Sequence, residues 1–228
     1  MPKKAYHHGD LKNALIQAAI AILAEEGVGG LSLRKAARRA GVSHAAPYAH
    51  FADKQALIAA VSTEGYRRIH ARLQAAAAPY PNDPLRRLVE GAWAYMEFAL
   101  EDPAHFRITL SGAVSREQDY PELVHATAES FALVVRIVAD CQAAGFLRKG
   151  RADLLAVNLW SAVHGLASLV VDGQISSAIL KRYTVRRLLV QTLTPYIQCR
   201  LPAGLHVTPK RVRQRKEPTG GSAARRAK

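Results

Sequence analysis

The stretch from Ser32 to Phe51 decides the fold, and it reads SLRKAARRAGVSHAAPYAHF. Its first half carries small apolar residues at helical spacing, which gives a short helix one narrow apolar face: Leu33, Ala36, Ala37 and Ala40. Four basic residues occupy the other side of that helix: Arg34, Lys35, Arg38 and Arg39. Gly41 allows a sharp turn, and a second short helix is expected over about residues 43–50. Two short helices joined by such a turn are typical of a helix-turn-helix.

In a helix-turn-helix the second helix enters the major groove of DNA. Here it would begin at Ser43 as its cap and present His44, Ala45 and Ala46 to the bases. Alanine contacts a thymine methyl group and histidine makes one hydrogen bond, so direct readout is expected to be thin and DNA shape to contribute. Three residues farther along are placed to donate to phosphates: Tyr48, His50 and Lys54. The alternative is a plain helical hairpin with a basic, solvated face.

Helical periodicity continues outward from this stretch, so we predict an all-α fold of about nine helices. Beyond the motif, helices are expected over about 10–26, from 53 onward, over 84–100, from 102, and over 120–144, 152–171 and 184–198. Prolines and alanines interrupt the pattern at 75–84, which marks a boundary. We therefore expect a DNA-binding domain at 9–69, with the helix-turn-helix at 32–51, and a larger helical ligand-binding and dimerisation domain at 84–200.

The net charge of +14 in 228 residues favours a polyanionic partner. Residues 203–228 supply half of it, and we expect this basic tail to be disordered. The tail is either a nonspecific DNA-binding arm or a solubilising extension. With only two cysteines and no long uninterrupted apolar run, the chain is expected to be cytoplasmic, without a disulfide framework and without a membrane partner.

No grouping of a nucleophile, a base and an orienting residue is recognisable, so we do not expect an enzyme. The nine histidines lack the spacing of a zinc site, and residues 27–30 lack the preceding strand of a dinucleotide-binding motif. No metal and no cofactor are expected.

Several short motifs together resemble the N-terminal domain of the TetR family of bacterial transcriptional regulators. They lie at 6–11, 24–27, 33–34, 40–43 and 48–54, within a resemblance that covers about residues 6–70. The resemblance implies a homodimeric, all-helical repressor that binds double-stranded operator DNA. By the family pattern the DNA contacts are Ser32, Arg34, Ser43, His44, Ala45, Tyr48, His50 and Lys54. Two residues depart from it: Ala49 replaces a larger side chain, and Pro47 is unusual within a short helix.

The C-terminal half resembles a TetR subclass marked by Trp-x-x-x-His-Gly, here Trp160, His164 and Gly165. The family pattern implies that the last two long helices, 152–171 and 184–198, pair across a two-fold axis. It also implies an apolar cavity for a small apolar effector, and six residues are candidates to line it: Trp93, Met96, Phe106, Phe131, Trp160 and His164. A filled core is the alternative, and His164 is favoured as a core histidine with satisfied hydrogen bonds.

The resulting hypothesis is a homodimeric repressor that a small apolar effector releases from a palindromic operator. The alternative is a ligand-independent, basic DNA-binding or structural protein that acts mainly through its tail.

Overall fold

The computed structural model describes residues 8–199, so the expectation for the tail at 203–228 lies outside the described residues. Within residues 8–199 the fold is all-α, as predicted, with nine α-helices, three short 3-10 helices and a single isolated β-bridge. The α-helices are α1 (His8–Gly30), α2 (Leu33–Arg39), α3 (Lys54–Ala77), α4 (Pro84–Glu101), α5 (Pro103–Leu110), α6 (Pro121–Ala143), α7 (Ala152–Val171), α8 (Ser177–Arg182) and α9 (Val185–Leu193). The 3-10 helices are η1 (Ala46–Ala49), η2 (Glu117–Asp119) and η3 (Thr194–Tyr196).

The N-terminal helices pack around their own apolar core. Leu15 and Ile22 of α1 meet Leu57 and Val61 of α3 there, and all four side chains are fully buried. Helix α1 changes direction at Gly27, whose φ of 67° is left-handed, so the sequence located the end of the regular helix correctly. The helix also begins two residues earlier than expected, at His8.

Side-chain caps fix the starts of several helices. The backbone N–H of Lys35 donates to Ser32 Oγ over 3.1 Å at the start of α2, and that of Ala56 donates to Asp53 Oδ1 over 2.8 Å at the start of α3. Asp83 caps α4 in the same way, and a proline occupies the first turn of α4, α5 and α6.

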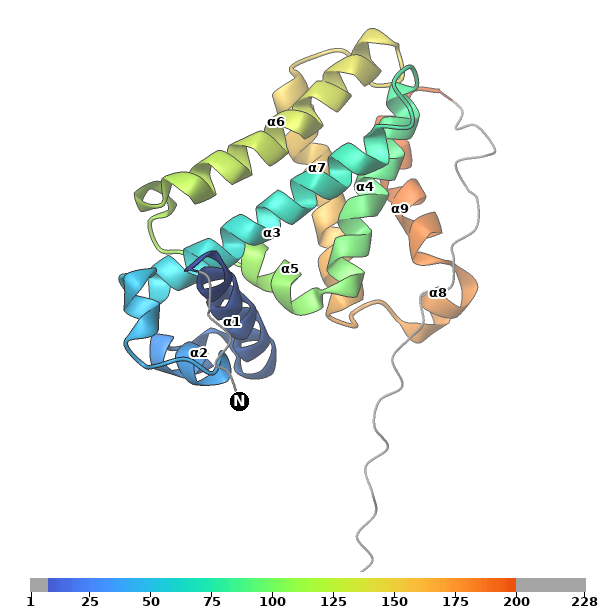
Figure 1. The fold of residues 1–228 in the computed structure, drawn as a ribbon. Coiled ribbons are helices and arrows are strands. Elements are labelled where there is room, and N and C mark those ends of the chain that lie inside the picture. The colour runs from blue at the N-terminus through green and yellow to red at the C-terminus, as the bar shows by residue number, and fades with distance from the viewer. Residues whose placement is uncertain (1–7, 200–228) are drawn as a thin grey trace, which may run out of the picture.

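Helix α3 joins the two halves of the molecule. In Figure 1 it runs from the group formed by α1 and α2 into the body formed by α4, α6 and α7. Its last turns contribute Ile69, Leu73 and Ala77 to a second core, which also contains Phe98 of α4 and Leu159 of α7. One continuous helix therefore takes part in both cores.

Three elements differ from the sequence-based expectation. The segment after α2 is a turn followed by the 3-10 helix η1, because Pro47 removes one backbone donor, and the Ser43 side chain caps no helix there. The last long helix ends at Leu193, and Pro195 follows within η3. Helix α8 was not predicted, since it has only six residues.

Helix α7 is unusually apolar, and among the described helices it alone is long and apolar enough to cross a membrane. Length and composition are weak evidence for such a role, since core helices of globular proteins meet the same criteria. In this fold one side of α7 packs against α4, α6 and α9, and 28% of its apolar window is buried. Four of its large apolar side chains are nevertheless exposed: Leu154, Val157, Trp160 and Leu169.

Candidate nucleic-acid interface and apolar cavity

Helix α2 divides its residues between the core and the surface. Leu33, Ala36 and Ala37 are buried against α1 and α3, as the apolar pattern predicted. Two of the four basic residues of α2 form ion pairs with α1. Arg39 donates to both carboxylate oxygens of Glu25 at 2.6 Å, and Lys35 pairs with Glu26.

Arg34 and Arg38, by contrast, are exposed and form no ion pair within the described part of the chain. Two of the four basic residues therefore fasten α2 to α1, whereas two present positive charge to solvent.

The segment after α2 forms a compact, exposed turn. Gly41 adopts a φ of 71°, which is the left-handed conformation that this reversal requires. Pro47 is buried and anchors η1 to the helices beneath it. The residues around that anchor are solvent-exposed and lie on the same short turn: Ser43, His44, Ala45, Tyr48 and Ala49. Tyr48 is 55% exposed, which is unusual for so large a ring without a partner.

The remaining predicted DNA contacts lie at the edges of this turn. Ala46 and His50 are partly buried, and Ser32 is exposed while its hydroxyl caps α2. Lys54 has a second role, because its ammonium donates to the Val28 carbonyl oxygen over 2.5 Å and so ties the start of α3 to the end of α1. We call the surface formed by Arg34, Arg38, Ser43, His44, Ala45 and Tyr48 the turn surface.

A partly open cavity of about 310 Å³ lies in the second half of the molecule and is lined by residues of α3, α4, α5, α6, α7 and η2. Its lining is almost entirely apolar or aromatic: Tyr66, Ile69, Leu73, Tyr95, Leu110, Glu117, Val124, Thr127, Ala128, Ser130, Phe131, Val134 and Trp160. We call it the main chamber. Its volume is in the range of pockets that hold small molecules, which begins at about 300 Å³.

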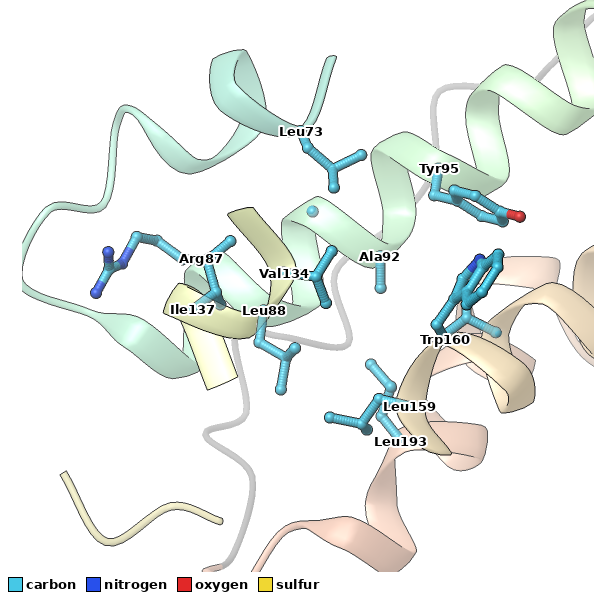
Figure 2. A pocket seen from close by; sticks show the side chains of 12 residues that line it. Leu73, Arg87, Leu88, Ala92, Tyr95, Val134, Ile137, Leu159, Trp160 and Leu193 are labelled. Carbon is cyan, nitrogen blue, oxygen red and sulfur yellow. The ribbon is translucent and has the colours of Figure 1, made fainter. Parts of the chain in front are cut away.

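A smaller chamber of about 60 Å³ shares Leu73, Tyr95, Val134 and Trp160 with the main one. Figure 2 shows Tyr95 and Trp160 with their rings close together at one end of this small chamber, and Arg87 pointing away from the other lining side chains at the opposite end. The Arg87 guanidinium donates to Asp140 over 2.9 Å, so its charge is compensated outside the chamber.

Tyr95, which lines both chambers, forms a polar pair with His164. Tyr95 Oη and His164 Nδ1 are 2.9 Å apart. Burial raises the pKa of Tyr95 and lowers the pKa of His164, so both groups are uncharged at neutral pH. The wall that separates the chamber from the core is therefore polarisable but carries no net charge.

The six residues predicted to line the cavity lie at different depths. Phe131 and Trp160 line the main chamber, whereas His164 and Phe106 lie one layer behind it, against Tyr95. Met96 is fully buried in the core, and Trp93 packs beneath the guanidinium of Arg186 on the side facing α9. Sequence analysis missed Tyr66, Tyr95 and Glu117, because helical periodicity indicates which face of a helix is apolar but not which neighbouring helix it meets.

Helix α5 contacts both the cavity and the N-terminal core. Leu110 lines the main chamber, and the Phe106 ring packs edge-on against Tyr95 at 5.7 Å between centroids. Ile108, on the same short helix, belongs to the N-terminal core. Helix α5 therefore connects the wall of the main chamber with the core of the helices that carry the turn surface.

A buried polar network fixes α5 to α3. The His105 ring is fully buried, and its Nε2 donates to the Val61 carbonyl oxygen over 2.9 Å. Arg68 donates to Asp102 over 3.1 Å, and its Nη1 lies 2.9 Å from His105 Nδ1. Hydrogen bonding to the His105 side chain is the main cause that lowers the pKa of Asp102 to about 2; its backbone N–H and Arg68 add to the effect, while partial burial opposes it.

Comparisons with known proteins agree with this architecture. Residues 15–61 match the family model described as bacterial regulatory proteins, tetR family, and residues 88–193 match the one described as tetracyclin repressor-like, C-terminal domain. A comparison with curated protein sequences found no significant match.

Solved structures give the same picture. A protein of unknown function from Rhodococcus sp. RHA1 is 34% identical with a TM-score of 0.72, over 86% of this chain and 100% of that one. A bacterial regulatory protein in the tetR family from Rhodococcus RHA1 is 22% identical, with a TM-score of 0.63, over 81% of this chain and 94% of its own. The TetR family transcriptional regulator PfmR from Thermus thermophilus is 18% identical with a TM-score of 0.62, over 79% and 97%. At such identities the last two show similarity of fold.

Proposed function

This chain belongs to the TetR family of bacterial regulatory proteins, and from that premise we propose that it is a homodimeric repressor which a small apolar effector releases from a palindromic operator. As a family member it is a transcriptional regulator with a helix-turn-helix DNA-binding domain.

The observation that carries the proposal is the turn surface. It combines two uncompensated arginines with a compact turn whose side chains are exposed around a buried proline. Arg34 and Arg38 supply phosphate contacts, which bind without sequence preference. Ser43, His44 and Ala45 reach the edges of the bases, and Tyr48 donates to a phosphate beside them.

An exposed stripe on α7 supports the dimer. Five residues share one side of the helix by their spacing and are exposed or half-buried: Leu154, Asn158, Ser161, Gly165 and Leu169. A Cβ atom at Gly165 would meet nothing within 4 Å, so the stripe has room for a closely crossing helix. In the proposed dimer α7 and α9 pack against their symmetry mates, with α8 at the edge.

Helix α5 supports release by an effector. A ligand that fills the main chamber pushes on Leu110 and on the Tyr95–Phe106 contact, and α5 passes this displacement to Ile108 in the N-terminal core. Arg107 donates to Asp172 and to the Val171 carbonyl oxygen at the end of α7, so α5 is also tied to the proposed dimer helix. Effector binding and operator binding then oppose each other through one reciprocal coupling energy.

Selection of genomic fragments by the purified protein, followed by sequencing, tests the DNA-binding part of the proposal. We expect the recovered fragments to share an inverted repeat, because a symmetric dimer reads two equivalent half-sites. Fragments without any common sequence would contradict the proposal.

The alternative function assigns DNA binding to the basic tail, which contributes half of the net charge of +14. Deleting residues 203–228 separates the two functions. Under our proposal the truncated protein still recognises the inverted repeat, with weaker nonspecific binding and a shallower salt dependence. Loss of all sequence preference on truncation would favour the tail.

A further inference from the structure

We propose that the main chamber binds a lipophilic organic cation, with a body of about two aromatic rings inside the chamber and a protonated amine at its mouth. The inference rests on the proposed function and changes it in one respect, because the effector has an apolar body but carries a charged head group.

The volume of the chamber sets the size of the body. An engineered protein cavity of about 150 Å³ holds one benzene molecule. The main chamber measures about 310 Å³, which is roughly twice that volume. Two fused rings, or an aliphatic body of similar bulk, therefore fill it.

The walls favour a flat, polarisable body. Four aromatic side chains line the main chamber: Tyr66, Tyr95, Phe131 and Trp160. Phe131 and Trp160 lie 6.4 Å apart between ring centroids, and Leu73 and Val134 lie between the two chambers. Aromatic faces stack on ligand rings and also attract positive charge.

Four polar groups of the chamber, one carboxylate and three hydroxyls, lie on α3, η2 and the first half of α6. The Thr127 hydroxyl is buried and interacts with the Tyr66 hydroxyl. Glu117 contributes an exposed carboxylate at the rim. Burial, reinforced by Glu117, raises the pKa of Tyr66, which therefore remains a neutral hydroxyl. Ser130 is already committed, because its hydroxyl donates to the carbonyl oxygens of Ala126 and Tyr66.

Acceptors of this kind match a donor-rich head group. An ammonium has three N–H donors and no acceptor, so the Glu117 carboxylate and the hydroxyl oxygens of Thr127 and Tyr66 are suitable partners for it.

Charge then distinguishes cations from anions. Among the residues that line the main chamber Glu117 alone is charged at neutral pH, and it is negative. Arg87 of the small chamber is already paired with Asp140. A carboxylate ligand would face the like charge of Glu117, which costs free energy.

The test compares three probes of nearly equal size on the full-length protein by isothermal titration calorimetry at pH 7: 1-naphthylmethylamine, 1-naphthalenemethanol and 1-naphthoic acid. We expect the amine to bind about five- to twentyfold more tightly than the alcohol, through the carboxylate and the aromatic faces. The acid should bind most weakly. An acid that binds as tightly as the amine, or no binding of any probe, overturns the inference.

Two variants test whether Glu117 causes the preference for the amine over the alcohol. Glu117→Gln should abolish the advantage of the amine over the alcohol and leave alcohol binding within about twofold, because the aromatic walls are unchanged. Glu122→Gln is the matched control, since Glu122 is an exposed acid that pairs with Arg67 and does not line the main chamber. An amine preference that survives Glu117→Gln, or that Glu122→Gln removes equally, overturns the assignment.

Operator binding, measured without any probe, separates this inference from the proposed function. Specific operator binding together with a missing amine preference rejects the ligand class alone. Absent operator binding rejects the proposed function.

Discussion

Gly65 of α3 and Thr109 of α5 approach so closely that a Cβ atom on Gly65 would stand 1.8 Å from the Thr109 hydroxyl oxygen and 2.8 Å from its Cβ. Only a glycine permits α3 and α5 to cross at this separation. The crossing lies beside the His105 network and places α5 where it contacts both the cavity and the N-terminal core.

Gly65→Ala should therefore destabilise the protein. We expect a loss of about 1–3 kcal/mol in the free energy of unfolding, because the added methyl group overpacks the contact between the α3 backbone and the buried Thr109 side chain. Urea denaturation measures it. Gly91→Ala is the matched control in α4, where a Cβ would meet nothing within 4 Å, and it should be neutral or stabilising by up to about 1 kcal/mol. Equal effects of the two substitutions would refute the tight crossing.

The Asp102 carboxylate should make the free energy of unfolding depend on pH in the acidic range. Its pKa is lowered to about 2 in the folded protein, so its stabilisation is complete above the unfolded value of about 4 and is lost as pH falls towards 2. Asp102→Asn should cost about 1–2 kcal/mol at pH 7, a figure reduced for the partial exposure of the carboxylate. The difference in the free energy of unfolding between wild type and variant, measured by chemical denaturation, should become smaller between pH 4 and pH 3. A gap independent of pH would contradict the network.

The two kinds of arginine on α2 should behave differently towards DNA. Arg34→Ala should weaken operator binding and reduce the slope of log affinity against log salt by about two per dimer, since each protomer loses one phosphate contact. The combined variant Arg39→Ala with Glu25→Ala removes an ion pair without changing the net charge, and its slope should equal that of the wild type. Fluorescence anisotropy over a salt series measures both. Identical slopes for the two variants would disprove the phosphate role of Arg34.

A charge on the exposed stripe of α7 should prevent dimerisation. Leu169 is 46% exposed, so Leu169→Arg should leave the protomer folded while placing like charges across the proposed two-fold axis. We expect monomers in sedimentation velocity and a loss of operator affinity of at least about tenfold. Ala139→Arg, at an exposed position on α6, should remain dimeric. A dimeric Leu169→Arg protein would exclude this interface.

Local sequence signals predicted most helix boundaries. Ser32 caps α2, as predicted, and Asp53 caps α3, whose start was predicted at this residue. The structure gives α7 the bounds that were predicted from the sequence. Helix caps and glycines act on the backbone within a few residues, so the helix boundaries that they set can be predicted from the sequence. Pro47 was noticed as unusual, but its consequence, a 3-10 helix in place of an α-helix, depends on burial against neighbouring helices.

The candidate sites were less predictable because they depend on tertiary contacts. The basic face of α2 was visible, but its division into paired Arg39 and exposed Arg34 depends on where α1 places Glu25. Likewise Phe131 and Trp160 line the main chamber, whereas Met96, on an equally apolar face, packs into the core. Helical spacing cannot distinguish a side chain that meets another helix from one that borders a cavity.

Footprinting of a selected operator fragment, with the wild type and with Tyr48→Ala, tests the central claim most directly. The account predicts two protected half-sites related by two-fold symmetry, with centres about 34 Å or one further helical turn apart. It also predicts strongly weakened protection with Tyr48→Ala, because that ring belongs to the turn surface. Uniform protection without half-sites, unchanged in the Tyr48 variant, would contradict it.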